Sequence, residues 1–180
     1  MKPTRVTPTG VERTFREDEI IVTKTDTRGV ITYANDVFLR VSALDESDAT
    51  GKPHNLIRHP DMPRAVFELL WDTVKDGREL FAYVLNLAAD GAHYRVFAHV
   101  TPSFDQDDRI VGYHSSRRRP KPAGIAAASE LYAQLRAEER RHASPPAELE
   151  AGRRMLHETL SGLGLTYDEF VWDLTNGVGR

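Results

Sequence analysis

One stretch, residues 51–63, constrains this chain more than any other. It reads Gly-Lys-Pro-His-Asn-Leu-Ile-Arg-His-Pro-Asp-Met-Pro and so carries three prolines, two histidines, an arginine and an aspartate. Each proline fixes its own φ and disfavours helical geometry in the residue before it, which predicts a stiff, irregular loop. Because this loop presents imidazole, guanidinium and carboxylate groups on a rigid backbone, we expect it to form the mouth of a ligand pocket.

The composition narrows the class of protein. The chain has 180 residues, of which 40% are hydrophobic and 28% charged, enough for one domain with an appendage. A net charge of −3 gives no general attraction to nucleic acid or to an anionic membrane. The absence of cysteine excludes disulfides, thiolate metal sites and cysteine nucleophiles. No apolar run approaches the ~20 residues of a membrane span, and residues 1–22 lack the apolar core of a signal peptide. We therefore expect a cytoplasmic protein without a membrane span.

The apolar pattern predicts strands and helices in a mixed order. Two β-branched runs flank a turn that ends at Gly29 and predict a hairpin. Asn35 offers an N-cap for a short helix, and Pro63 precedes apolar residues at helical spacing. Three further strands follow between residues 80 and 117, with clear period-2 alternation over 93–100. This order predicts an α+β fold, an antiparallel sheet with helices packed on one face.

Three segments follow from the composition. Residues 1–18 are rich in Pro, Thr and Arg and read as a loose leader or a cap, residues 19–119 form the α+β domain, and residues 120–180 form a linker and a helical tail. The basic run 117–121 is interpreted as a solvated linker, because no aromatic residues are interleaved as in a nucleic-acid site; contact with anionic lipid is the alternative.

An apolar stripe predicts the first helix of the tail. It consists of Ile125, Leu131, Tyr132 and Leu135. An amphipathic helix buries its apolar face, and two partners are open here: a second copy of the chain, or the exposed face of the sheet.

The loop at 51–63 resembles the signature of PAS domains of the aerotaxis-receptor type. The resemblance continues in register over residues 19–119. Its further matching positions are Asn35, Phe38, Phe67, Trp71, Gly77, Asn86, Gly91 to Tyr94, Gly112 and Tyr113. It implies a PAS fold, a five-stranded antiparallel sheet with flanking helices.

In that family the pocket typically holds FAD, whose redox state reports oxygen or respiratory status to a chemotaxis pathway. The resemblance thus implies a redox or oxygen sensor that signals to a protein partner, or as a homodimer, through the leader or the tail. Carried over by position, the candidate cofactor-binding residues are Asn35, Arg58, His59, Asp61, Trp71 and Asn86. Arg58 can form two parallel hydrogen bonds to a phosphate or ring carbonyl, and the Asn86 amide can both donate and accept.

The strand over residues 80–87 departs from the family pattern Trp-x-Gly-x-Val-Lys-Asn-Arg. The departures, together with the change of Tyr-Trp-Val to Tyr-Arg-Val, fall at Leu80, Ala82, Leu85, Leu87 and Arg95. A stacking ring and two cations are therefore missing where an anionic dinucleotide would need them. Haem, another apolar ligand, or a ligand-free interaction module are the alternatives to FAD.

The loop at 51–63 also contains residues suited to metal binding. His54, His59 and Asp61 are suitable metal ligands, but no clear further ligand accompanies them, so hydrogen bonds that tie the loop to the sheet are the simpler role. Ser115 and its neighbours lack the strand–elbow–helix context of a hydrolase, and we expect no catalytic activity.

A haem would need an axial donor, usually a histidine. His93, His99 and His114 lie on the predicted three-stranded meander, and alternation places His99 on the side opposite Val96 and Val100. Such positions either face solvent or reach a pocket.

Overall fold

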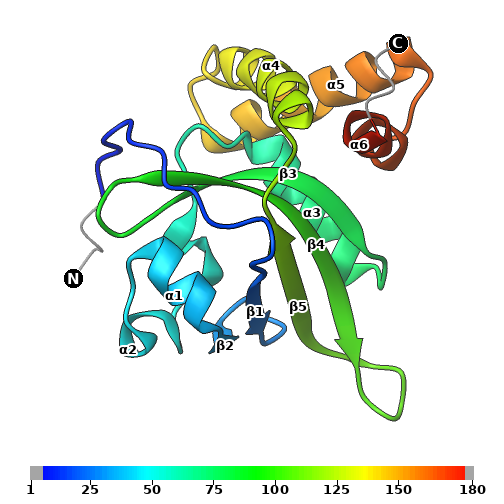
Figure 1. The fold of residues 1–180 in the computed structure, drawn as a ribbon. Helices are drawn as coiled ribbons and strands as arrows, with labels where there is room; N and C mark the ends of the chain where they lie inside the picture. Colours follow the sequence, from blue (N-terminus) through cyan, green and yellow to red (C-terminus); the bar gives the residue numbers. More distant parts are fainter. Residues whose placement is uncertain (1–5, 177–180) are drawn as a thin grey trace.

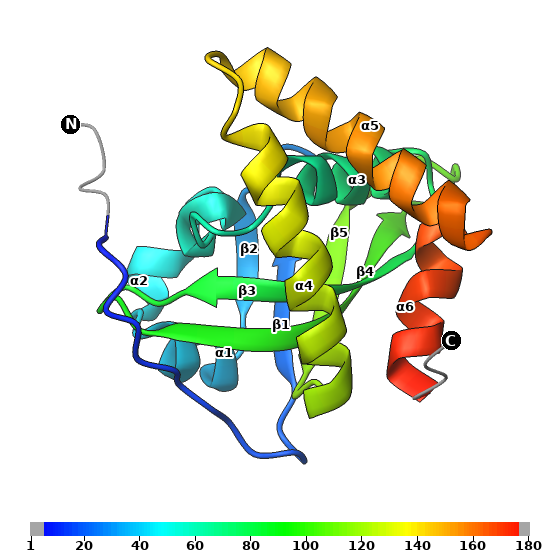
Figure 2. The same ribbon diagram turned by 90° about the horizontal axis from the view of Figure 1, so that it is seen from above.

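The computed structural model describes residues 6–176, and these form one curved sheet with helices on both faces (Figures 1 and 2). The sheet has five strands, all antiparallel, in the order β2-β1-β5-β4-β3. Their bounds are β1 (Ile21–Thr25), β2 (Ile31–Ala34), β3 (Leu80–Leu87), β4 (His93–Phe104) and β5 (Ile110–Arg118). The expected α+β architecture with a five-stranded antiparallel sheet is confirmed.

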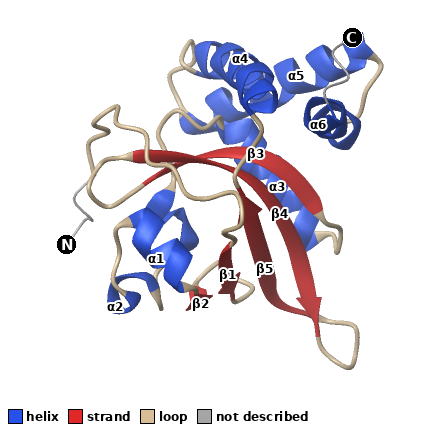
Figure 3. Cartoon of the chain, in the orientation of Figure 1, coloured by secondary structure: helices blue, strands red, loops and turns tan. Residues whose placement is uncertain are grey.

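The short helices that precede the three-stranded meander and the helix that directly follows it lie on opposite sides of the sheet (Figure 3). The short helices and α3 precede it: α1 (Asp36–Ser42), α2 (Glu46–Ala49), the 3₁₀ turn η1 (His54–Ile57) and α3 (Arg64–Lys75). The helical tail follows it: α4 (Pro122–Glu139), α5 (Pro145–Leu163) and α6 (Tyr167–Asn176). The loop at 51–63 is irregular apart from η1, as its prolines require.

The strand register defines two faces. Asn86 lies opposite Tyr94, Val100 opposite Ser115, and Ser115 opposite Thr23. Cross-strand partners share a face, so these side chains and their i±2 neighbours form one surface, which we call the inner face. The alternate positions form the outer face.

The leader docks on the end of the β3–β4 hairpin. Glu12 pairs with His93 on β4 where β5 no longer runs alongside it, and the backbone N–H of Thr9 donates to the carbonyl of Gly91 at 2.9 Å. Phe15 is buried in the core. The described residues of the leader therefore lie against the sheet, whereas the sequence predicts a loose leader or a swung-out cap; residues 1–5 lie outside the described part.

The tail folds back onto the same chain. Leu131 and Leu135 of α4 are buried, and the Tyr132 hydroxyl donates to the carbonyl oxygen of Tyr83 on β3 at 2.8 Å. Figure 2 shows α4 crossing β3 and α5 lying beside α3. Within this chain, the apolar stripe therefore covers the outer face of the sheet.

The interpretation of the basic run 117–121 as a solvated linker is wrong for Arg117. β5 extends through Arg118, and Arg117 is buried on the inner face with only 4% of its surface exposed. In the described residues, no helix combines the length and apolar character that crossing a membrane requires.

Candidate functional site

A cavity of about 70 Å³ lies between the inner face of the sheet and α3, and the loop at 51–63 forms part of its wall. Apolar side chains of α3 make one wall. The opposite wall is polar, with contributions from β1, β3 and β5: Thr23, Thr25, Asn86, Ser115 and Arg117. We call this space the inner cavity.

The polar wall is incompletely hydrogen bonded. Four of its buried atoms have no partner among the described residues: Thr25 Oγ1, Asn86 Nδ2, Ser115 Oγ and Arg117 Nη1. A buried polar group without a partner costs about 1–3 kcal/mol, and native proteins rarely leave several together. Their convergence on one cavity indicates a place for a polar molecule that completes these bonds.

A buried guanidinium sets the electrostatics of this wall. Arg117 Nη2 donates to Thr23 Oγ1 at 2.8 Å and to His54 Nε2 at 2.6 Å. Burial lowers the pKa of Arg117 to about 10, and burial together with the Arg117 charge lowers the pKa of His54 well below its ordinary value. At neutral pH the arginine is therefore charged and the imidazole is a neutral acceptor, so Nη1 remains as a cationic donor toward the cavity.

Aromatic side chains on α3 close the other side. The Trp71 ring meets Tyr113 edge-on with centroids 5.5 Å apart, and the Arg58 guanidinium lies 4.4 Å from the centroid of Phe67. Gly29 makes room for the indole, because a Cβ at this residue would lie 2.9 Å from the Trp71 ring. The Arg58 side chain is half-buried, and this burial lowers the pKa of its guanidinium group.

Three of the six predicted site residues line the inner cavity: Arg58, Trp71 and Asn86. A backbone bridge between Arg58 and Asn86 joins the loop to β3 and holds the two side by side.

The other three predicted residues line no part of this cavity. Asn35 caps α1, since its Oδ1 accepts from the N–H groups of Phe38 and Val22, both at 3.0 Å. His59 Nδ1 accepts from the N–H of Asp61 at 3.1 Å and so braces the loop. The Asp61 carboxylate is exposed and accepts from Arg140 at 3.0 Å.

The charge argument drawn from β3 does not apply to this cavity. Leu85 pairs with Arg95 and Leu87 with His93 on the outer face, away from Asn86. Arg95 forms an ion pair of 2.7 Å with Glu12 of the leader. The leucines at these two positions thus lie on the outer face, and they remove no charge from the inner cavity.

The strand register also shows where the histidines considered for haem and metal binding lie. His93, His99 and His114 all lie on the outer face; His99 is hydrogen bonded to Glu79 at 2.7 Å and stacked on Phe81. The prediction that His99 lies on the other face of the strand from Val96 and Val100 is confirmed. Within residues 6–176 no three His, Asp or Glu side chains come together as a metal site, and His54 and His59 serve different contacts.

Sequence reasoning missed most of the polar wall. Thr23, Thr25, Ser115 and Arg117 alternate at period 2 along β1 and β5, which was the available signal. Polar residues in such an alternation ordinarily indicate a solvated surface, and Arg117 begins a run of three arginines that is typical of a linker.

Comparisons with known proteins place the chain. Residues 31–117 match the family model described as PAS fold. The chain is 40% identical to the aerotaxis receptor of Escherichia coli (strain K12) over 121 residues, which are 67% of this chain and 24% of the receptor. It is 25% identical to a nitrogen fixation regulatory protein of Klebsiella pneumoniae over 99 residues, 55% of this chain and 20% of that protein. The chain thus spans about a quarter or less of the length of these curated relatives.

Solved structures agree on the fold. The dark structure of the blue-light photoreceptor Aureochrome1 LOV superposes with a TM-score of 0.53 at 20% identity, covering 63% of this chain and 82% of that one. The PAS domain of the fruit-fly ELK potassium channel gives 0.51 at 14% identity, covering 55% and 85%. With the family match and the 40% identity, the fold leads to one conclusion: residues 31–117 of this chain form a PAS domain of the aerotaxis-receptor type.

Proposed function

We propose that this PAS domain is a sensor of redox or oxygen status that holds the ring of a flavin, as FAD, in the inner cavity. The observation that carries the proposal is the group of four buried polar atoms on one wall that lack partners among the described residues. The resemblance to aerotaxis-receptor PAS domains supplies the cofactor class. A cytoplasmic location and the absence of catalysis stay predictions.

The donor set suits a planar heterocycle with carbonyl oxygens and ring nitrogens. The Asn86 amide and Arg117 Nη1 donate, and the Ser115 hydroxyl can donate or accept. A flavin supplies a redox-active ring whose charge and protonation differ between its oxidised and reduced forms. Arg117 and Asn86 would then hold an anionic or neutral ring edge unequally, which is the differential contact that a two-state sensor requires.

The route from the cavity to the tail runs through α3. The first turn of α3 has no side-chain cap of its own; instead, the N–H of Ala65 donates to Glu139 Oε1 of α4 at 3.1 Å. Arg64 adds an ion pair of 2.6 Å to Glu148 of α5. A displacement of α3 by a ligand therefore acts directly on the contacts that hold the tail. We infer that a protein partner, or a second copy of the chain, reads the position of these helices.

The cavity volume favours a second candidate function. Ligand pockets of proteins commonly measure about 300–1,000 Å³, whereas this cavity measures about 70 Å³, space for a few water molecules. FAD binding requires an outward shift of the partly exposed residues Phe67, Leu70 and Trp71. Without such a shift, water completes the polar wall, and the domain is a ligand-free interaction module.

An absorbance spectrum of natively purified protein, followed by titration with FAD, separates the two. We expect flavin absorbance, and for Asn86→Leu an affinity for FAD roughly 2- to 12-fold weaker, the equivalent of one hydrogen bond of about 0.5–1.5 kcal/mol. Asp61→Asn is the matched control. Because Asp61 lies outside the inner cavity, the affinity of this variant for FAD should equal that of the unaltered protein.

Unfolding measurements on both variants check that each is folded. Colourless protein that takes up no FAD would establish the ligand-free module, and its oligomeric state would then be measured on the full chain. A Soret band would identify haem instead. Equal loss of FAD in the Asn86 and Asp61 variants would contradict the placement of the site.

A further inference from the structure

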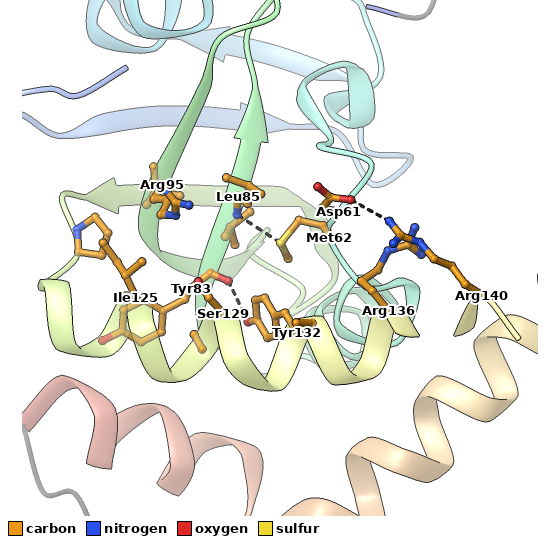
Figure 4. Close-up of a pocket in the computed structure, with 15 residues that line it drawn as sticks. Asp61, Met62, Tyr83, Leu85, Arg95, Ile125, Ser129, Tyr132, Arg136 and Arg140 are labelled. Carbon is orange, nitrogen blue, oxygen red and sulfur yellow. Dashed lines mark hydrogen bonds and ion pairs between the residues drawn. The ribbon is translucent and has the colours of Figure 1, made fainter. Parts of the chain in front are cut away.

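A second, larger cavity lies on the outer face of the sheet, between β3, β4 and α4. Its volume is about 350 Å³, roughly five times that of the inner cavity and within the range of small-molecule sites. Figure 4 shows α4 running along its length, with the strands on the opposite side. We call it the tail cavity, since it exists only because the tail covers the sheet.

The floor and sides of the tail cavity are largely apolar. Tyr83 and Leu85 contribute from β3, and Ile125, Ala128 and Tyr132 contribute from α4. The hydroxyl of Tyr132 is already used by the carbonyl of Tyr83 and by Tyr167, so its ring serves as an apolar wall. Such walls can bury the hydrocarbon part of a ligand, which stabilises binding by about 25 cal/mol for each Å² of apolar surface removed from water.

The charged residues of the lining are mostly cationic. Three arginines, Arg95, Arg136 and Arg140, accompany one carboxylate, that of Asp61. In Figure 4, Arg136 and Arg140 lie together beside Asp61, and Arg95 lies apart from them on the strands. Each of these guanidinium groups also has a carboxylate partner: Glu12 for Arg95, Glu139 for Arg136 and Asp61 for Arg140. An anionic head would therefore bind by sharing guanidinium groups that are already paired, through their remaining N–H donors.

Arg136 has donor capacity left. Its Nη1 donates to Glu139 at 2.9 Å, but its buried Nε has no partner among the described residues. The side chain is 17% exposed, so the group is largely removed from water while facing the cavity that it lines. A guanidinium fork matches a carboxylate or phosphate with two parallel hydrogen bonds.

We propose that the tail cavity binds a small amphipathic anion, an acidic head with a short apolar chain. The head contacts Arg136 and Arg140, and the chain lies along Leu85 and Tyr132. This site is separate from the proposed flavin site and does not depend on it. It has a physical link to it, however, because Met62 and Val84 line both cavities and Met62 Sδ accepts from the N–H of Leu85 at 3.2 Å.

Octanoate is a suitable probe, with octanol as its uncharged match. The full chain is titrated with each by calorimetry, at concentrations where octanoate is monomeric. We expect one octanoate to bind per chain, and octanol to bind at least tenfold more weakly. Arg136→Gln should weaken octanoate roughly 10-fold or more, as expected for the loss of a charged hydrogen bond, while exposed Arg118→Gln should have no effect.

A blocking variant tests the location independently of charge and of folding. Ala133 is an exposed residue of α4 that lines the tail cavity, so Ala133→Trp should obstruct it and abolish octanoate binding. Ala137→Trp, on the same helix outside the lining, should bind octanoate like the unaltered protein. The flavin content of each preparation is recorded in parallel, and octanoate binding by the two variants should not depend on it.

Three outcomes would overturn the proposal: no octanoate binding, equal affinity for octanoate and octanol, or undiminished binding by Ala133→Trp. Binding to phosphatidylglycerol vesicles without binding to monomeric octanoate would also overturn it, because it would assign the arginines to a lipid surface.

Discussion

Replacing Gly152 by alanine should destabilise this protein, although alanine is the better helix former. Gly152 lies inside α5, where Ala is ordinarily favoured over Gly by about 1 kcal/mol. Here a Cβ would lie 2.7 Å from Glu139 Oε1 and 3.1 Å from the Cβ of Ala65. The fully buried Glu139 carboxylate is the group that completes the first turn of α3, so it has nowhere to retreat without giving up that bond.

The expected magnitude follows from these contacts. Overpacking a close contact costs about 1–3 kcal/mol, and a hydrogen bond to a charged group contributes about 1.5–3 kcal/mol. Against the gain in helix preference, Gly152→Ala should lower the free energy of unfolding by about 2 kcal/mol or more. Urea denaturation at pH 7 measures this directly.

Gly162 is the matched control in the same helix. It is exposed, and a Cβ there would meet nothing within 4 Å. Gly162→Ala should therefore raise the free energy of unfolding, by about 0.5–1 kcal/mol. In a Glu139→Ala background the clash with Glu139 is absent and only the 3.1 Å contact with the Cβ of Ala65 remains, so Gly152→Ala should be much less destabilising there. If Gly152→Ala stabilised the otherwise unaltered protein as Gly162→Ala does, the packing of Glu139 between α3 and α5 would be refuted.

Two further predictions concern the region around the inner cavity. Burial and the charge of Arg117 lower the pKa of His54, so below about pH 6.5 the unfolded chain takes up a proton at this residue that the folded protein does not. The free energy of unfolding should therefore fall as the pH drops from about 6.5 to about 5. In urea titrations, His54→Gln should reduce this pH dependence by up to about 1.4 kcal/mol per pH unit. An unchanged slope would show that other groups, such as His59 and His114 with their lowered pKa values, account for it. Asn35→Ala should lower the free energy of unfolding by about 1–2 kcal/mol through loss of the α1 cap, without changing the affinity for FAD; a selective loss of FAD at full stability would return Asn35 to the ligand site.

The sequence was sufficient for the fold, and three of the six predicted site residues line the inner cavity. The prolines at 53, 60 and 63 require an irregular loop, and the loop's spacing identifies the family, so Arg58, Trp71 and Asn86 could be placed at a cavity from the sequence. These are positions where one local segment determines the geometry.

The remainder depends on which strands pair, and a local pattern does not contain that information. Ser115 and Arg117 become cavity residues only because β5 lies between β1 and β4 with its polar side chains turned inward, which inverts the usual pattern of apolar residues inside. Leu85 and Leu87 flank Asn86 in the sequence, but the pleat of β3 turns Asn86 inward and both leucines to the outer face. The tail cavity was not predicted, because it forms between elements that are far apart in the chain.

The cap that α4 gives to α3 bears on the order in which the chain folds. Ala65 and Glu139 are 74 residues apart, so during synthesis the first turn of α3 must wait for the end of α4 to leave the ribosome. Until then, the outer face of β3 is bare and its apolar residues are available to other nascent chains. A chaperone requirement that ends once residue 139 has left the ribosome is the expected result. A shortened chain that stops at the end of the PAS domain should aggregate before it could report anything about signalling.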